Sequence, residues 1–238
     1  MQVSHSVMLI PFILSTGCSV FGIRSSEELP YTVRYETDGI EVRDYPAHLA
    51  AQTTSSGEQK NPQGKLFRRL ANFIFGGNSG NQSIAMTAPV ITGFHRGRNI
   101  VPSTVAPAPN IKSSTHQAPQ TEHWHMRFSM PASFKKDTLP TPIDPEVEIV
   151  EVSAQTVLAS RFSGSFNDSK KRLEHIRRLE AWLEANPNYE SVGEPMFAGY
   201  DPPFTIPYFR RNEVLFRIKT VKSVSPAPAA SKDAPSSL

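Results

Sequence analysis

Two strands, one helix and two further strands are expected twice in succession along this chain, and this order constrains the fold more than any other feature. The first copy contains Glu41-Val42, Ala47 and Leu49-Ala50-Ala51, and the second contains the similar Glu148-Ile149, Ala154 and Val157-Leu158-Ala159. The repeat is weak and too long for a solenoid unit. It therefore indicates a duplicated half-domain.

The helix of the first copy is expected at 62–75, where apolar residues recur at helical spacing: Leu66, Phe67, Leu70, Phe73 and Ile74. Pro62 suits a first turn, and Gly76-Gly77 suits a helix end. The helix of the second copy is expected to begin at the Asn167-Asp168-Ser169 cap and to end before Pro187, with one apolar face formed by Leu173, Ile176, Leu179, Trp182 and Leu183. Both helices are amphipathic, so each should lie on a sheet.

Strands are expected after the first helix near 84–90 and 124–130, and after the second near 191–200 and 214–218. Strand pairs separated by single helices favour an α+β fold with mostly antiparallel pairing. With 238 residues, 38% of them hydrophobic, the chain can form one sizeable core. We expect one globular domain at 31–220.

The strand near 84–90 is interrupted by Thr87-Ala88-Pro89. A proline inside an apolar run argues against a regular central strand, so the ladder should break there, through a bulge or a cis Ala88-Pro89 bond. The Thr87 hydroxyl is placed to satisfy backbone groups that such a break leaves unpaired.

The N-terminus is expected to be a targeting segment. Residues 7–14 form an apolar run of signal-peptide length, and Ser15-Thr16-Gly17-Cys18 resembles a bacterial lipobox. Cys18 is the only cysteine, which excludes an intramolecular disulfide. We expect a leader at 1–18 with Cys18 lipidated, a linker at 19–30, and a periplasm-facing protein anchored in the bacterial cell envelope. The alternatives are a free thiol in a disordered leader, and a secreted or soluble periplasmic protein.

Two other segments are expected to lie outside the core. Residues 97–121 carry scattered prolines without an apolar period and indicate a loop insertion, and 221–238 are rich in Pro, Ala and Ser and indicate a disordered tail. A net charge of +3, with cations scattered among acidic residues, does not favour nucleic acid as a partner.

Five segments together resemble the SOUL haem-binding family. They are Ser83-Ile84-Ala85-Met86-Thr87-Ala88-Pro89-Val90, the segment 31–45 with Glu41-x-Arg43-x-Tyr45, Gly76-Gly77, Phe162-Ser163-Gly164, and Ala198-Gly199-Tyr200-Asp201-Pro202-Pro203 followed by Arg210-Arg211-Asn212-Glu213-Val214. The resemblance implies a distorted antiparallel β-barrel of two pseudo-symmetric ββαββ halves with two long flanking helices. It also implies non-covalent binding of haem or a related tetrapyrrole.

A haem site needs an apolar slot, cations for the propionates and often an iron ligand. Candidates for the slot are Phe67, Leu70, Ile74, Met86, Phe204 and Ile206; candidates for the carboxylates are Lys65, Arg68, Arg69, Arg210 and Arg211. The alternative for each apolar residue is an ordinary core position, and for each cation a solvated surface.

The resemblance also implies positions for basic residues and for the axial ligand. Of the three positions where the family has basic residues, the first is occupied here by Lys65, and the other two are occupied by the uncharged Phe73 and Ile206. The position proposed for an axial histidine is occupied by Asp44. His48 is expected on the same strand face as Asp44 and is the fallback iron ligand; the alternative is an exposed histidine at a strand end.

Other chemistry is sparse. His123 and His125 share a strand face, but no Cys or suitably spaced carboxylate completes a metal shell, and no C-x-x-C-H motif for covalent haem occurs. We therefore expect a non-enzymatic tetrapyrrole carrier or buffer. The alternatives are a binder of other hydrophobic small molecules, cationic ones included, like the effector domains of bacterial regulators, and a hydrolase using Glu194, with or without Asp201, or a tyrosine.

Overall fold

The computed structural model describes residues 26–56, 62–96 and 122–221. The expected leader, most of the expected linker, the loop insertion and nearly all of the tail lie outside these ranges. Among the described residues, no helix combines the length and apolar character needed to cross a membrane.

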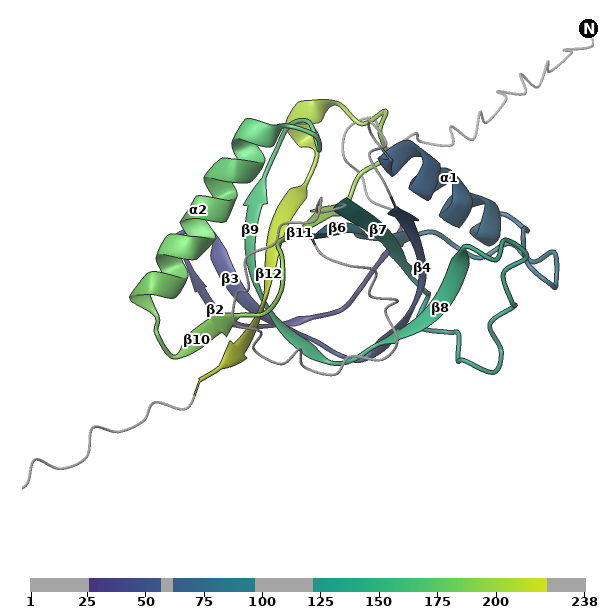
Figure 1. Ribbon diagram of the computed structural model, residues 1–238, viewed down its shortest axis with the longest axis horizontal. Helices are drawn as coiled ribbons and strands as arrows, with labels where there is room; N and C mark the ends of the chain where they lie inside the picture. Colours follow the sequence, from purple (N-terminus) through teal and green to yellow (C-terminus); the bar gives the residue numbers. More distant parts are fainter. Residues whose placement is uncertain (1–25, 57–61, 97–121, 222–238) are drawn as a thin grey trace, which may run out of the picture.

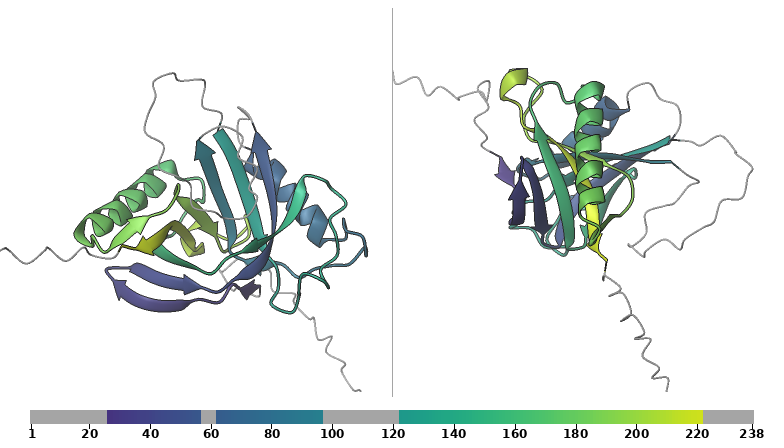
Figure 2. Two further views of the ribbon diagram at one scale, coloured as in Figure 1. Left: turned by 60° about the horizontal axis from the view of Figure 1, so that its bottom comes forward. Right: turned by 90° about the vertical axis from the view of Figure 1, so that its left-hand side faces the viewer.

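A ten-stranded sheet forms the body of the protein, and it curls into a half-barrel (Figures 1 and 2). Its order is β2-β3-β9-β12-β11-β6-β7-β4-β8, with β10 paired to β12, and every pairing in it is antiparallel. The strands are β2 Thr32–Thr37, β3 Ile40–Tyr45, β4 His48–Ser56, β6 Val90–Arg96, β7 Glu122–Ser129, β8 Val147–Val152, β9 Gln155–Phe162, β10 Tyr189–Ser191, β11 Met196–Gly199 and β12 Asn212–Thr220. The expected α+β antiparallel fold is confirmed, while the pseudo-symmetry of its halves stays a prediction.

Helices α1 (Gln63–Ile74) and α2 (Ser169–Ala185) lie outside the curl, as expected, on opposite sides of the molecule (Figure 1). Asp168 caps α2 by accepting hydrogen bonds from the backbone N–H groups of Lys170 and Lys171. Leu173 was expected on the buried face of α2, but this is wrong, because its side chain is 47% exposed. The buried residues of α2 are His175, Leu179 and Trp182.

Each face of the sheet has its own core because side chains alternate along a strand. Outside, α2 packs on one cluster with Leu158, Val214 and Phe216, and α1 packs on another with Met126 and Phe128. The concave face carries a third cluster: Tyr45, Ala88, Val157, Ala159, Met196, Ala198, Tyr200 and Leu215. Any group on the concave face is therefore shielded from both helices by the sheet itself.

The break expected at Thr87-Ala88-Pro89 is confirmed. The Ala88-Pro89 peptide bond is cis, and only a two-residue strand, β5 (Thr87–Ala88), precedes it. The Thr87 hydroxyl donates to the Ser129 carbonyl at 2.6 Å, which is the role in backbone satisfaction expected from the sequence. β5 pairs in parallel with β1 (Glu27–Glu28), so the break holds the first described strand against the half-barrel.

A buried ion cluster joins β3 to β12 across β9. Arg43 donates two hydrogen bonds to Glu213, at 2.6 and 3.1 Å, and the two residues are 1% and 0% exposed. Glu213 also accepts from the Tyr200 hydroxyl and from Arg211, both at 2.9 Å. Arg211 reaches β1 through an ion pair with Glu28 at 3.0 Å. The cluster thus holds β1, β3 and β12 together.

The charge of Glu213 is maintained by its partners. Burial alone would raise the pKa of this carboxyl, but the hydrogen bonds and charges of Arg43 and Arg211 lower it. Removing one partner of a buried ion pair leaves the other charge uncompensated in a medium of low dielectric, which is strongly destabilising.

We expect Glu213→Gln to lower the free energy of unfolding by about 3–5 kcal/mol, because Arg43 and Arg211 keep their charges and lose the carboxylate. Urea denaturation at neutral pH measures the change. The matched control is Glu190→Gln on the adjacent β10, whose ion pair with Lys219 is solvent-exposed. The control should cost less than about 1 kcal/mol. Equal losses in the two variants would contradict a special role for Glu213.

The difference in stability between wild type and Glu213→Gln should depend on pH in one direction. The folded pKa of Glu213 lies below its ordinary value, so its contribution is present above about pH 4.5 and is lost as the pH falls through the folded pKa. The stability gap between wild type and Glu213→Gln should therefore shrink as the pH falls below about 4.5.

Candidate functional site

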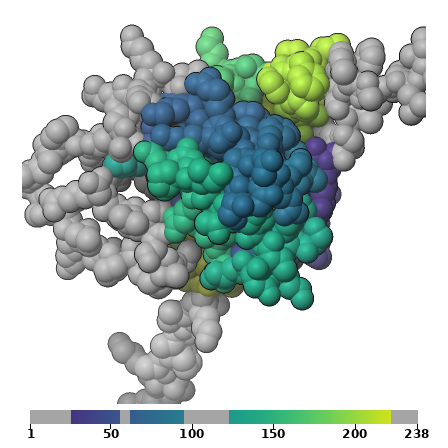
Figure 3. Space-filling model, turned by 90° about the vertical axis from the view of Figure 1, so that its right-hand side faces the viewer, coloured from purple at the N-terminus to yellow at the C-terminus, as the bar shows by residue number. Residues whose placement is uncertain are grey.

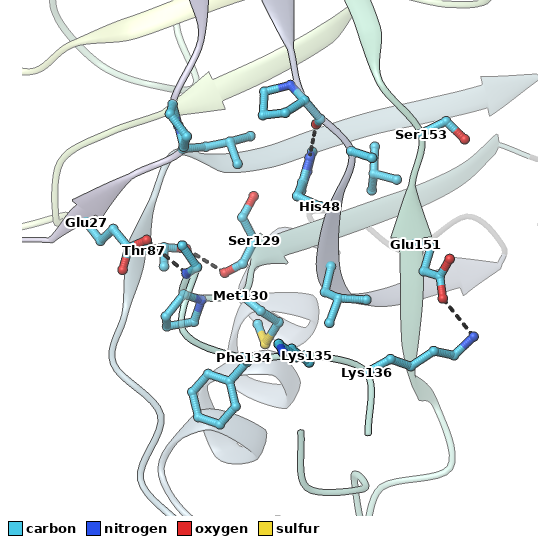
Figure 4. A pocket seen from close by; sticks show the side chains of 18 residues that line it. Glu27, His48, Thr87, Ser129, Met130, Phe134, Lys135, Lys136, Glu151 and Ser153 are labelled. Carbon is cyan, nitrogen blue, oxygen red and sulfur yellow. Dashed lines mark hydrogen bonds and ion pairs between the residues drawn. The ribbon is translucent and has the colours of Figure 1, made fainter. Parts of the chain in front are cut away.

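A cavity of about 480 Å³ opens where β4, β7 and β8 meet the segment after β7 (Figure 4). Its volume is within the range of about 300–1,000 Å³ that is usual for small-molecule sites. The lining residues come from five places in the sequence: Glu27, Leu29, Pro30; Pro46, Ala47, His48, Leu49; Thr87; Ser129, Met130, Pro131, Ala132, Phe134, Lys135, Lys136; and Glu151, Val152, Ser153.

His48 lies at the start of β4, between Ser129 on β7 and Glu151 on β8 (Figure 4). Its Nδ1 is 3.0 Å from the carbonyl oxygen of Pro46. A carbonyl can only accept, so Nδ1 carries the proton and Nε2 keeps its lone pair. Within the described part of the chain, Nε2 makes no hydrogen bond. A backbone carbonyl on the other ring nitrogen is the usual support of a metal-bound histidine.

The protonation state of His48 suits the same role. Burial lowers the pKa of the imidazole, and the charge of Arg127 lowers it further, while the bond to Pro46 opposes both effects. The ring is therefore neutral at pH 7, as a metal ligand must be.

The rest of the wall is mostly apolar, with charge at the rim. Leu29, Leu49, Met130, Phe134 and Val152 supply apolar surface. Lys135 and Lys136 are exposed, and the ammonium of Lys136 is 2.8 Å from the Glu151 carboxylate, with both side chains in solvent. Apolar walls with a few cations at the edge suit a flat hydrophobic ligand that carries carboxylates.

Four of the residues proposed for the slot lie in or against the core under α1. Leu70 and Ile74 are 0% and 1% exposed, and Phe67 packs edge-on against Phe128 at a centroid distance of 5.3 Å. Met86 packs against the same cluster. A ligand could reach Leu70 or Ile74 only by displacing this packing, so the ordinary core alternative describes these two residues.

The two apolar residues proposed near the C-terminus lie elsewhere. Phe204 and Ile206 are exposed on the loop before β12 and do not line the cavity. Arg210 donates to the carbonyls of Thr205 and Pro203 and so serves this loop, and Arg211 belongs to the buried ion cluster.

The cations proposed on α1 also lie apart from the cavity. Lys65 and Arg68 are exposed, and Arg69 forms ion pairs with Asp144 and Glu146. The structure therefore brings neither these cations nor the proposed apolar residues into the cavity; His48 is the one proposed site residue that lines it.

The relation expected between Asp44 and His48 does not hold, because β3 ends at Tyr45 and His48 begins β4. Asp44 instead accepts a hydrogen bond from Thr156 at 2.8 Å and pairs with Arg34. Asp201, weighed above as a possible acid, accepts the backbone N–H of Arg211 at 2.6 Å and so supports its loop.

Two arginines lie on the concave face with no acidic partner in the described ranges. Arg217 lies opposite Val157, and Arg127 lies opposite Ile91, both beside the concave cluster. Burial, with the charge of Arg217 adding to it, lowers the pKa of Arg127 to about 10. Arg127 donates to Gln52, a neutral group. These two arginines therefore place positive charge on the concave face.

Sequence reasoning missed the segment after β7. Met130, Phe134, Lys135 and Lys136 form much of the cavity wall, but the segment has no strand or helix period that would mark it. The adjacent Lys135-Lys136 pair, shortly after the end of β7, was the available signal.

Three solved structures resemble the fold. The C-terminal domain of EcmrR is 12% identical with a TM-score of 0.50, covering 80% of this chain and 99% of its own. EcmrR in a DNA complex is 13% identical with a TM-score of 0.51, and the match covers 76% of this chain and 57% of the EcmrR chain. An uncharacterized conserved protein from Listeria innocua is 8% identical with a TM-score of 0.52, covering 76% and 92%. At such identities the likeness shows the fold alone.

A family model gives a more specific result. Comparison with curated protein sequences finds no match, but the model described as SOUL heme-binding protein matches residues 26–217, which include the cavity, both helices and the buried ion cluster. Because this match covers most of the chain, the protein belongs to the SOUL heme-binding family.

Proposed function

We propose that this protein binds haem or a related tetrapyrrole in the cavity beside His48, without catalysing a reaction, as an envelope-anchored carrier or buffer. The observation that carries the proposal is the imidazole of His48, whose Nδ1 is fixed on the Pro46 carbonyl and whose Nε2 is left for a ligand. Family membership supports haem as the ligand class.

The residues present fit this group. The cavity supplies apolar walls for a porphyrin face, and His48 could bind iron through Nε2. Lys135 could hold one propionate, and Lys136 could hold the other by exchanging its exposed partner Glu151 for it. Haem, when bound, supplies a redox-active iron. The chain supplies apolar contact, rim cations and a neutral imidazole, which hold and orient the group.

A binder of hydrophobic cations fits less well. Arg127 and Arg217 place two positive charges on the concave face, and Arg127 adds to the lowering of the His48 pKa that burial causes. A cationic ligand near these groups would meet like charges, which disfavours binding. An anionic tetrapyrrole dicarboxylate would meet charges of the opposite sign.

His48→Ala should remove the spectroscopic signature of imidazole ligation and weaken haemin binding by roughly tenfold or more, about 1.4 kcal/mol. Haemin titration followed at the Soret band measures both effects, and wild type should saturate at low-micromolar haemin or below. His123→Ala is the matched control, because His123 lies on β7 away from the cavity lining. An unchanged spectrum in His48→Ala would contradict ligation by His48.

Reversing the charge at the cavity rim tests whether the tetrapyrrole binds in the cavity or on the surface of α1. Lys135→Glu with Lys136→Glu should weaken haemin binding by roughly threefold to tenfold, because propionates would meet carboxylates. Lys65→Glu on α1 should leave the affinity unchanged. The same titration tests both variants, and loss in Lys65→Glu alone would move the tetrapyrrole to α1.

The anchoring part of the proposal is tested separately. The full chain expressed in a bacterial host should incorporate an alkyne-bearing fatty acid and fractionate with membranes, because Cys18 follows a lipobox-like segment. Cys18→Ser should abolish the incorporation, whereas Ser25→Ala should not. Equal labelling of wild type and Cys18→Ser would contradict lipidation at this residue.

A further inference from the structure

The loop that joins β11 to β12 presents a compact group of exposed apolar side chains. Phe204 is 61% exposed, Ile206 40%, Tyr208 78% and Phe209 43%. We call these four residues the apolar knuckle. A short 3-10 helix, η2 (Pro207–Phe209), forms its outer part. Figures 1 and 3 show this loop protruding from one end of the molecule. Large apolar side chains gathered at a protruding tip are typical of a contact surface.

The loop is held in shape by its own polar groups. Arg210 donates through Nε to the Thr205 carbonyl at 2.7 Å and through Nη2 to the Pro203 carbonyl. The Pro207 carbonyl accepts the Gly164 N–H at 2.8 Å, and Thr205 is 0% exposed. These bonds and the burial of Thr205 fix the shape of the loop, with the apolar knuckle at the surface.

Cations lie at the same end of the molecule as the knuckle. The first two turns of α1 and the first turn of α2 lie at this end (Figure 1) and carry exposed Lys65, Arg68 and Lys170. None of these three forms an ion pair within the described ranges. Two acidic groups near the loop are already engaged: Asp168 caps α2 and Asp201 accepts the Arg211 N–H. Segment 202–209 itself contains no acidic residue.

We propose that the apolar knuckle inserts into the interface of an anionic phospholipid membrane. Aromatic and aliphatic side chains enter the boundary between headgroups and acyl chains, while nearby lysines and arginines are attracted to anionic headgroups. The exposed tip provides the first element, and the cations at the ends of α1 and α2 provide the second.

The start of the described chain favours a membrane over a protein partner. Glu28 is paired with Arg211, directly after the loop, at 3.0 Å. Residues 19–25, which separate Cys18 from Ser26, can span at most roughly 28 Å. A lipid on Cys18 would therefore keep this end of the molecule near the bilayer. This nearness to the bilayer rests on the proposed lipidation of Cys18, so the test removes the anchor.

The test uses the full chain carrying Cys18→Ser, mixed with vesicles of phosphatidylglycerol and phosphatidylcholine. Adding Phe204→Ser and Tyr208→Ser should weaken co-sedimentation by roughly tenfold. The matched control adds Phe75→Ser and Ile143→Ser, which remove two equally exposed apolar residues, each 69% exposed, from outside the knuckle. Residues 1–25 are otherwise common to all variants, so their contribution cancels. Equal binding of all variants, or equal loss in loop and control variants, would overturn the proposal.

A second measurement shows directly whether residue 208 enters the membrane. In the Cys18→Ser chain, Tyr208→Cys and Ile143→Cys each provide one thiol for an environment-sensitive dye. Vesicles should shift the emission to the blue at 208 and leave it unchanged at 143. A shift at neither or at both positions would overturn insertion by the knuckle.

Haemin titration of the variant with Phe204→Ser and Tyr208→Ser distinguishes membrane insertion from the proposed tetrapyrrole binding. Affinity for haemin should be unchanged while vesicle binding falls. A variant that loses haemin affinity and keeps vesicle binding would assign the knuckle to the tetrapyrrole site and overturn membrane insertion. Failure of haemin binding in wild type would leave the vesicle results unaffected.

Discussion

The ion pair between Arg43 and Glu213 is the interaction on which the arrangement of this protein depends. Both side chains lie inside the protein at 1% and 0% exposure, and their hydrogen bonds are bidentate. A buried pair is not in itself a strong source of net stability, because desolvation offsets much of the attraction. We infer an effect on specificity: an alternative strand register would bury one charge without the other, at a cost of about 3–5 kcal/mol, which is a large part of the about 5–15 kcal/mol that stabilises a typical domain.

Two regions, the cavity and the loop that carries the knuckle, begin at members of this cluster. Arg43 lies on β3, which leads through Pro46 to His48 in the cavity. Arg211 ends the loop that carries the apolar knuckle, and it holds Glu28 of β1. Side chains alternate along an extended chain, so Glu28 points to the cluster while its neighbours Glu27 and Leu29 line the cavity. One cluster therefore fixes one wall of the cavity and the base of the loop.

The sequence predicted the helices and the break at Pro89 well, because each has a local cause. Asp168 and Gly76-Gly77 mark helix ends through backbone chemistry, and proline cannot continue a strand ladder. Leu173 was misplaced because helical spacing defines a stripe only to within one residue, and tertiary packing decides which edge is buried. The cavity was not predictable, since its wall unites β1, β4, β7 and β8 with an aperiodic segment. The partner of His48 is a backbone carbonyl, which no residue pattern reveals.

The position of the cations favours the cavity beside His48 over the slot on α1 that the sequence suggested for a tetrapyrrole. At α1 the apolar candidates Leu70 and Ile74 pack in the core. They therefore offer a ligand no apolar surface beside Lys65. At the cavity, Lys135 and Lys136 lie at the rim of a wall that contains Met130 and Phe134. A porphyrin gains most of its affinity from apolar burial and places its carboxylates in solvent, so it needs both features together. Of these two places, the His48 cavity combines them, and it adds an imidazole in the neutral form that iron requires.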